Sequence, residues 1–267
     1  MRVSVLGSTG AMGGFVIKAA LQEGFIVQNR VSSKDSIDNL FRNSEAIIDF
    51  SCPIATESML RFALENKTNV PLVIGTTGLS RMHVDLMKEC ALSFPVFYAP
   101  NMSFLIAIVN MAVYAISKLL DDDFDTEILD IHHKLKKDAP SGTALMLGKT
   151  IARARGKTFS QVANFVRYGI IEQRKRGEIG FAVQRCGNVI GTHEISFMGE
   201  FEDLKIRHEA HSKEIFAKGA VQASKWIIKQ QKGLYTMNDF TKDLMVPMVK
   251  SLYKEFFTSG YDFDREN

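Results

Sequence analysis

The sequence of 267 residues has few cysteines, no long hydrophobic run and little net charge. Its cysteines, Cys52, Cys90 and Cys186, are odd in number and show no C-x-x-C spacing, which excludes a disulfide framework and a zinc site of the usual spacing. The longest apolar run, residues 104–116, is interrupted by Asn110 and is shorter than the roughly 20 residues that span a bilayer. The net charge of +3 is too small to indicate nucleic acid. We therefore expect no metal site, no membrane partner and no nucleic-acid partner.

The first residues also leave no room for a signal peptide. The chain opens Met-Arg-Val-Ser-Val-Leu-Gly, which enters a strand at once. Unpaired cysteines fit a reducing compartment, so we expect a soluble, cytoplasmic protein. Hydrophobic residues make up 46% and charged residues 24%, which is ordinary globular usage, and the length predicts two lobes.

The first hundred residues alternate between strand and helix patterns. Short apolar runs predict strands at 2–6, 25–27, 46–50, 71–74 and 96–98, and helical spacing appears at 15–21 and 55–66. This order is typical of a Rossmann-like, doubly wound parallel sheet. Helical periodicity returns at 214–230 and 239–257.

The middle of the chain has a different pattern. An apolar helix after residue 103, a strand at 126–131 and a helix at 143–155 precede period-two alternation between 178 and 210. Such alternation is typical of antiparallel strands with one solvated or partner-covered face. We therefore predict a second α+β lobe that contains an open mixed or antiparallel sheet.

Three glycines, Gly7, Gly10 and Gly13, lie between the first strand and the first helix. In this context glycines let the backbone approach a pyrophosphate at a helix N-terminus, although the first interval is one residue longer than in the commonest fingerprint. The pattern indicates dinucleotide binding, and the alternative is a glycine turn without a ligand.

The second strand should end near the adenine ribose. The region 28–34 contains Ser33 and Lys34 and no acid before Asp35, whereas an NAD site usually places a carboxylate there. A hydroxyl and a cation suit a 2′-phosphate, so we favour NADPH over NADH. The alternative is a merely polar surface loop.

Two further turns follow the fourth and fifth predicted strands, at 75–78 and 99–102. Both should lie at the carboxyl edge of the sheet, where doubly wound folds bind ligands. Each alone could be ordinary turn chemistry.

The segment 130–145 contains the highest density of residues suited to catalysis or anion binding. A strand ends at His132 and His133, lysines follow at 134, 136 and 137, and a Pro-Ser-Gly-Thr turn begins a helix. Histidine moves protons near neutral pH, lysine can protonate a developing anion, and a helix start can hold a carboxylate. The alternatives are a surface histidine pair and, for at least one lysine, a solvated basic loop.

Residues 132–144, which read HHKLKKDAPSGTA, closely resemble the signature of the dihydrodipicolinate reductases, also called 4-hydroxy-tetrahydrodipicolinate reductases. Further motifs resemble that family in the same order and span essentially the whole chain: 7–13, 48–51, 75–78, 99–103, 187–193 and 216–220. Three features depart from it, namely Met102 where many relatives have an aromatic residue, Lys213 where they usually have arginine, and a short loop after Lys34.

The resemblance implies His132 as catalytic acid/base, Lys136 as proton donor, and His133, Gly142 and Thr143 as substrate contacts. It also implies a set of residues that line the dinucleotide, to which the reasoning above adds Ser33 and Lys34: Gly7, Ser8, Thr9, Gly10, Ala11, Met12, Gly75, Thr76, Thr77, Ala99, Pro100, Asn101 and Met102. The expected domains are 1–103 with 212–267 for the dinucleotide and 104–211 for the substrate and oligomerisation.

The expected activity is NAD(P)H-dependent reduction of a small cyclic dicarboxylate in diaminopimelate and lysine biosynthesis, by a homotetramer. The rivals are another two-lobed NAD(P)-dependent amino-acid dehydrogenase and a dinucleotide sensor without turnover. We expect His193 and His208 to be partly buried, hydrogen-bonding histidines outside the site, and the basic run 174–176 to be a solvated loop.

Overall fold

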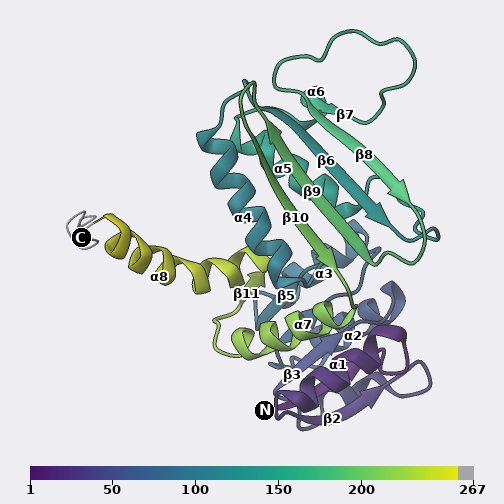
Figure 1. The fold of residues 1–267 in the computed structure, drawn as a ribbon. Coiled ribbons are helices and arrows are strands. Elements are labelled where there is room, and N and C mark those ends of the chain that lie inside the picture. Colours follow the sequence, from purple (N-terminus) through teal and green to yellow (C-terminus); the bar gives the residue numbers. More distant parts are fainter. Residues whose placement is uncertain (258–267) are drawn as a thin grey trace. The chain divides into compact units, whose positions relative to one another are not determined.

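The computed structural model describes residues 1–257, with side chains described to residue 251 (Figure 1). The chain forms two compact units. The first contains Met1–Phe104 and the chain from Phe216 onward, and the second contains Leu105–Ile215. No helix among the described residues combines the length and the apolar character needed to cross a membrane.

The first unit is built on a six-stranded sheet whose paired neighbours all run parallel. In the order β11-β5-β4-β3-β1-β2, the strands are Gly233–Tyr235, Pro95–Tyr98, Leu72–Ile74, Ala46–Asp49, Arg2–Leu6 and Ile26–Val31. This confirms the predicted doubly wound parallel sheet. The sequence patterns had not indicated β11.

The first unit also contains helices. They are α1 (Ala11–Gln22), the 3₁₀ turn η1 (Ile37–Phe41), α2 (Pro53–Glu65), α3 (Arg81–Cys90), α7 (Glu214–Ile227) and α8 (Met237–Phe257). The core strands are largely apolar, as in a sheet covered on both faces, and Ile47, Ile48, Leu72 and Ile74 are fully buried.

The second unit has a five-stranded sheet in the order β10-β9-β6-β8-β7. These strands are Asp203–Ala210, Gly191–Met198, Asp125–His132, Ile179–Arg185 and Ala163–Asn164. β9 runs antiparallel to both β6 and β10, whereas β8 runs parallel to β6 and β7. The sheet is therefore mixed, as expected for the lobe, but β8 is not the antiparallel strand that its alternation suggested.

One face of this second sheet is the core of its unit. Alternate residues of β6, Thr126, Ile128, Asp130 and His132, are buried. Ile128 clusters with residues of α4 (Phe104–Leu119) and α5 (Gly142–Ala154), and α6 (Phe159–Val162) completes the helices. The last buried positions of β6 are polar, which places chemistry-bearing side chains at the end of the strand.

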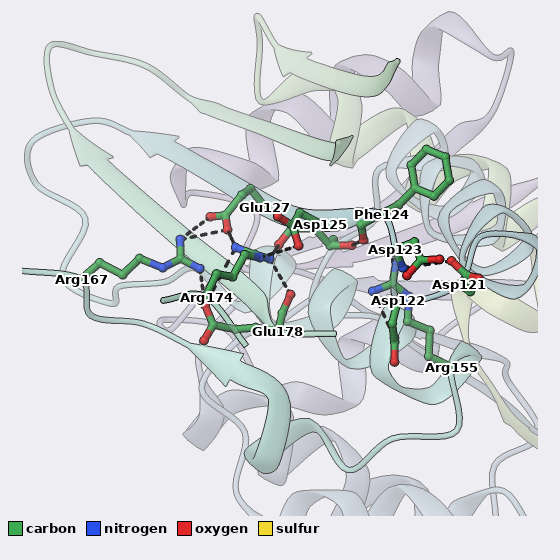
Figure 2. Close-up of polar contacts among 11 residues, drawn as sticks. Asp121, Asp122, Asp123, Phe124, Asp125, Glu127, Arg155, Arg167, Arg174 and Glu178 are labelled. Atoms are coloured by element: carbon green, nitrogen blue, oxygen red, sulfur yellow. Dashed lines mark hydrogen bonds and ion pairs between the residues drawn. The ribbon is translucent and has the colours of Figure 1, made fainter. Parts of the chain in front are cut away.

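A long loop joins β7 to β8 and extends away from the sheet (Figure 1). Its base is fixed by ion pairs to β6 (Figure 2). Arg174 contacts Glu127 and places Nε 2.9 Å from Oδ1 of Asp125, while Arg167 contacts both Glu127 and Glu178. The prediction of a solvated basic run at 174–176 is therefore wrong for Arg174, which is paired with acidic residues of β6. The local sequence could not indicate this pairing, because these acids lie almost fifty residues earlier in the chain.

Candidate active site

The glycine turn after β1 is tightly enclosed by backbone. Gly7 has a φ of 80°, and a Cβ there would lie 2.7 Å from the carbonyl oxygen of Phe50. A Cβ at Gly13 would overlap the Gly7 carbonyl oxygen. Side chains at these two positions would fill the turn, so the structure fits the close backbone approach that a pyrophosphate requires.

Helix α1 begins directly after this turn, with Gly10 as a cap that offers no side chain. The first N–H groups of a helix have no acceptor within it and favour an anion. The residues predicted to line the dinucleotide here are half-buried or exposed: Gly7, Ser8, Thr9, Gly10, Ala11 and Met12. This arrangement can hold a phosphate.

The end of β2 is joined to the same turn. The backbone N–H groups of Gly7 and Ser8 both donate to the carbonyl oxygen of Val31, at 2.9 and 3.1 Å. Ser33 and Lys34 follow and are exposed. Asp35 accepts hydrogen bonds from the Ser32 N–H and hydroxyl at 2.8 and 2.7 Å, which lower the pKa of Asp35. The nearest acid is therefore engaged within its own turn.

Asp49 anchors the loop after β3. It is fully buried and accepts hydrogen bonds from the N–H of Ser51, at 2.9 Å, and from the hydroxyls of Ser51 and Thr56. Burial raises the pKa of Asp49, and these hydrogen bonds oppose that effect. The Ser51 N–H also lies 3.1 Å from Oγ1 of Thr76, which ties this loop to the turn after β4.

The remaining predicted cofactor residues follow β4 and β5. A Cβ at Gly75 would overlap the Phe50 ring, and Thr77 is exposed. Ala99 and Met102 are buried, while Pro100 is exposed and Asn101 is half-buried, with its Oδ1 accepting from the Ser103 N–H at 2.9 Å. Because a Cβ at Gly219 would overlap the Met102 carbonyl oxygen, α7 packs directly against this loop.

The predicted acid–base residues belong to the second unit, and His132 is the last residue of β6. Only 8% of His132 is exposed, and its Nδ1 lies 2.9 Å from Oδ1 of Asp130. Ser141, the N-cap of α5, donates to Asp130 from both its N–H and its hydroxyl, each at 2.8 Å. One buried carboxylate therefore contacts both the histidine and the helix start.

Lys136 is the half-buried lysine of the basic segment. Its Nζ lies 2.8 Å from Oδ1 of Asp138, whereas Lys134 and Lys137 are exposed. Burial alone would raise the pKa of Asp138, but the hydrogen bond and charge of Lys136 hold it below its ordinary value. The expectation that only some of these lysines take part in chemistry agrees with this difference in exposure.

The predicted substrate residues lie at the same end of the unit. His133 follows β6 and is half-buried, with a buried Nδ1. Gly142 and Thr143 form the first turn of α5, and a Cβ at Gly142 would meet open space. The helix start can thus receive a carboxylate without steric hindrance at Gly142.

Sequence reasoning left His193 out of the site, but the structure brings it to Asp130. In the β6–β9 ladder His193 is the register partner of Asp130, and its Nε2 lies 3.4 Å from Oδ1 of Asp130 and 3.1 Å from the Ser141 hydroxyl. The His132 and His193 rings are 5.2 Å apart, edge to face. His208 is buried as well, and burial, followed by the charges of His193 and His211, lowers its pKa.

Among the described residues, Asp130, His132 and His193 form one group with the donor types of a metal site. Oδ2 of Asp130 already accepts from the Ser141 N–H and lies 3.1 Å from the guanidinium of Arg185. Because fixed donors and a cation already surround this carboxylate, we interpret the group as a hydrogen-bonding network.

A hollow of about 500 Å³ lies on the opposite face of the same sheet. Ile131 and Thr192, which line it, alternate with His132 and His193 along β6 and β9. Successive side chains of a strand point to opposite faces, so this hollow is separate from the acid–base residues.

Two family models match successive parts of the chain. The model described as "Dihydrodipicolinate reductase, N-terminus" matches residues 1–102, and the model described as "Dihydrodipicolinate reductase, C-terminus" matches residues 106–241. The 4-hydroxy-tetrahydrodipicolinate reductase of Rickettsia africae is 40% identical over 246 residues, covering 91% of this chain and 99% of that relative. The enzyme of that name from Geotalea uraniireducens is 35% identical over 263 residues, covering 90% and 98%.

Solved structures show the same fold. The dipicolinate-bound dihydrodipicolinate reductase from Paenisporosarcina sp. TG-14 has a TM-score of 0.67 at 21% identity, over 88% of this chain and 97% of that one. The diaminopimelate dehydrogenase of C. glutamicum has a TM-score of 0.53 at 13% identity, over 90% and 93%. At these identities the likeness concerns architecture alone.

Proposed function

The chain belongs to the dihydrodipicolinate reductase family, and on that premise we propose that it reduces 4-hydroxy-tetrahydrodipicolinate to tetrahydrodipicolinate with a nicotinamide dinucleotide. This reaction belongs to diaminopimelate and lysine biosynthesis. The observation that carries the proposal is the match of both family models, which together span residues 1–102 and 106–241. The half-buried Lys136 and the buried His132, within the signature segment, support it.

The two units have different roles in this proposal. In the first unit the glycine turn and the start of α1 hold the dinucleotide, which supplies a hydride when bound. In the second unit Lys136 donates the proton that reduction also needs, and His132 serves as the neighbouring acid–base group. The first turn of α5, with Gly142 and Thr143, binds one substrate carboxylate through its N–H groups and helix dipole.

A steady-state assay tests this function. Nicotinamide absorbance is followed while the preceding synthase generates the unstable substrate, and NADH and NADPH are run in parallel. Turnover with either cofactor supports the reductase. A folded, nucleotide-binding protein without turnover would instead be the sensor, and turnover only with amino acids would indicate a dehydrogenase of the kind that shares this fold.

For the cofactor we propose a preference for NADPH, carried by Lys34. Replacing Lys34 by alanine is expected to weaken NADPH binding about tenfold, because a charge-assisted hydrogen bond to the 2′-phosphate contributes roughly 1.5–3 kcal/mol and this side chain is exposed. NADH binding should not change. Calorimetric titration with both nucleotides measures the two affinities.

The matched control for Lys34 is Lys88→Ala, which removes the same charge from α3, where Lys88 lies 3.3 Å from Asp85. It should leave both affinities unchanged. Equal NADPH affinity in wild type and Lys34→Ala would show that Lys34 is a solvated loop residue, and Arg30 would be tested next.

We also propose that the enzyme is a cytoplasmic homotetramer assembled through the second sheet. On the side of this sheet opposite the core, Gly180, Thr192 and Ser196 are small and buried within the chain, and Ala182 is small and exposed. The β7–β8 loop beside it exposes Val166, Tyr168 and Ile170 almost completely. A soluble chain rarely leaves such a surface uncovered.

Light scattering at micromolar concentration should therefore give four times the chain mass of 29.9 kDa. Replacing Tyr168 and Ile170 together by serine should shift the mass toward smaller species, whereas Leu92→Ser, at an exposed apolar residue of the first unit, should not. A monomer mass for the wild type would disprove the assembly.

A further inference from the structure

We propose that Asp130 is a positioning residue, which fixes the proton of His132 on Nδ1 and joins that ring to the start of α5. The inference rests on the proposed function, in which His132 is an acid–base group. Asp130 lies two residues before His132 on β6, and its side chain is fully buried.

The orientation of the Asp130 carboxylate is set by donors that cannot accept. Oδ2 receives the Ser141 N–H at 2.8 Å and lies 3.1 Å from Nη2 of Arg185. Arg185 is the register partner of His132 on β8, and its guanidinium also donates to the carbonyl oxygen of Asp138 at 2.6 Å. A backbone N–H and a guanidinium can only donate hydrogen bonds, so Oδ2 of Asp130 must be an acceptor.

The other oxygen, Oδ1, faces the histidine. It lies 2.9 Å from Nδ1 of His132 and 3.4 Å from Nε2 of His193, and it accepts from the Ser141 hydroxyl at 2.8 Å. Burial by itself would raise the pKa of Asp130, but hydrogen bonds from His132, His193 and Ser141 hold it well below its ordinary range. An ionised carboxylate only accepts, so Nδ1 of His132 must carry a proton.

This assignment makes Nε2 the nitrogen of His132 that gains and loses a proton. Nε2 lies beside Gly191, where a Cβ would approach it to 3.0 Å, so residue 191 places no side chain against this nitrogen. The same carboxylate holds Ser141, and the ring and the first turn of α5 therefore move together. Catalysis benefits because an acid–base group and a carboxylate site keep a fixed spacing.

Nitrogen-15 NMR of the six histidines tests the tautomer directly, with His132 assigned from the spectrum of His132→Gln. In the neutral ring we expect Nδ1 protonated and Nε2 bare. In Asp130→Asn the amide oxygen must face the Ser141 N–H and Arg185, so the amide NH₂ points at His132 and donates to Nδ1. The ring should then adopt the opposite tautomer, with the proton on Nε2.

Kinetics give the second readout. Asp130→Asn should lower kcat about 10²-fold, the lower end of what an acid–base group contributes, with unchanged nucleotide affinity. Asp130→Glu, which can only accept, should restore the Nδ1-protonated tautomer.

Glu194→Gln is the matched control, because it removes a carboxylate from the adjacent β9, where Glu194 pairs with Arg207 at 3.0 Å. It should alter neither the tautomer nor kcat. A wild-type spectrum with the proton on Nε2 would overturn the proposal, and that outcome does not depend on whether Asp130→Asn folds. An unchanged tautomer in folded Asp130→Asn would overturn it too. Absent turnover in the wild type would instead refute the proposed function, since the NMR result does not depend on substrate.

Discussion

Replacing Lys136 by alanine is expected to lower kcat by about 10²- to 10⁴-fold, the contribution typical of a general acid–base group. Lys136 is half-buried and its Nζ lies 2.8 Å from Oδ1 of Asp138, a contact that orients the side chain. The residues proposed to bind the nucleotide belong to the first unit, so nucleotide affinity should change little. Steady-state kinetics, with nucleotide affinity measured separately by titration, distinguish a lost proton donor from a lost cofactor site. His132→Ala should act in the same direction.

Lys137→Ala is the control for this experiment. It removes the same side chain from the next position, but Lys137 is exposed, so kcat should stay within about twofold of wild type. If Lys136→Ala turned over normally, the assignment of the proton donor would be wrong, and Lys134 and Lys137 would become the candidates.

The second large effect is expected from Gly13→Ala. The added Cβ would overlap the backbone carbonyl oxygen of Gly7, and backbone cannot move aside as a flexible side chain can. Overpacking of this kind costs typically 1–3 kcal/mol of unfolding free energy. Since the displaced turn is the one that should hold the pyrophosphate, we also expect nucleotide affinity to fall at least tenfold, or about 1.4 kcal/mol.

Gly14→Ala provides a matched control in the same helix. A Cβ at Gly14 meets nothing within 4 Å, so this variant should bind nucleotide normally and gain about 0.5–1 kcal/mol from the better helix propensity of alanine. Thermal unfolding and nucleotide titration on both variants measure the two effects. Equal affinities for Gly13→Ala and Gly14→Ala would show that the turn does not contact the nucleotide.

The sheet of the first unit was predictable because buried parallel strands are largely apolar, as 46–48 and 72–74 are. Strand β11 was not predicted because it has three half-buried residues and no apolar run. The direction of β8 could not be predicted either. Alternation of apolar and polar residues indicates which face of a strand is buried, but not whether the neighbouring strand runs parallel or antiparallel to it. Direction emerged only from its pairing with β6.

Within the site, the predicted residues were those in contiguous motifs. His132 and Lys136 share one segment, which a sequence motif can reveal. Asp130 and His193 are separated by more than sixty residues and meet only through the register of β6 and β9. The alternation of core-facing residues along β9 correctly indicated that His193 is buried. No local sequence pattern, however, indicates which side chain of the neighbouring strand lies opposite it. The pairing and register of β6 and β9 would have to be known before the contact between Asp130 and His193 could be predicted.

The late position of β11 in the chain affects how the protein is made on the ribosome. Strand β5 pairs with β11, yet Tyr98 and Gly233 are separated by the entire second unit. During synthesis the first five strands emerge early, but one edge of their sheet stays open until the chain has passed residue 235. Contacts between such distant segments form slowly, because a long loop must close first. The inserted unit can therefore complete its fold before the unit that surrounds it, and until then β5 is an unprotected edge to which chaperones or other nascent chains can bind.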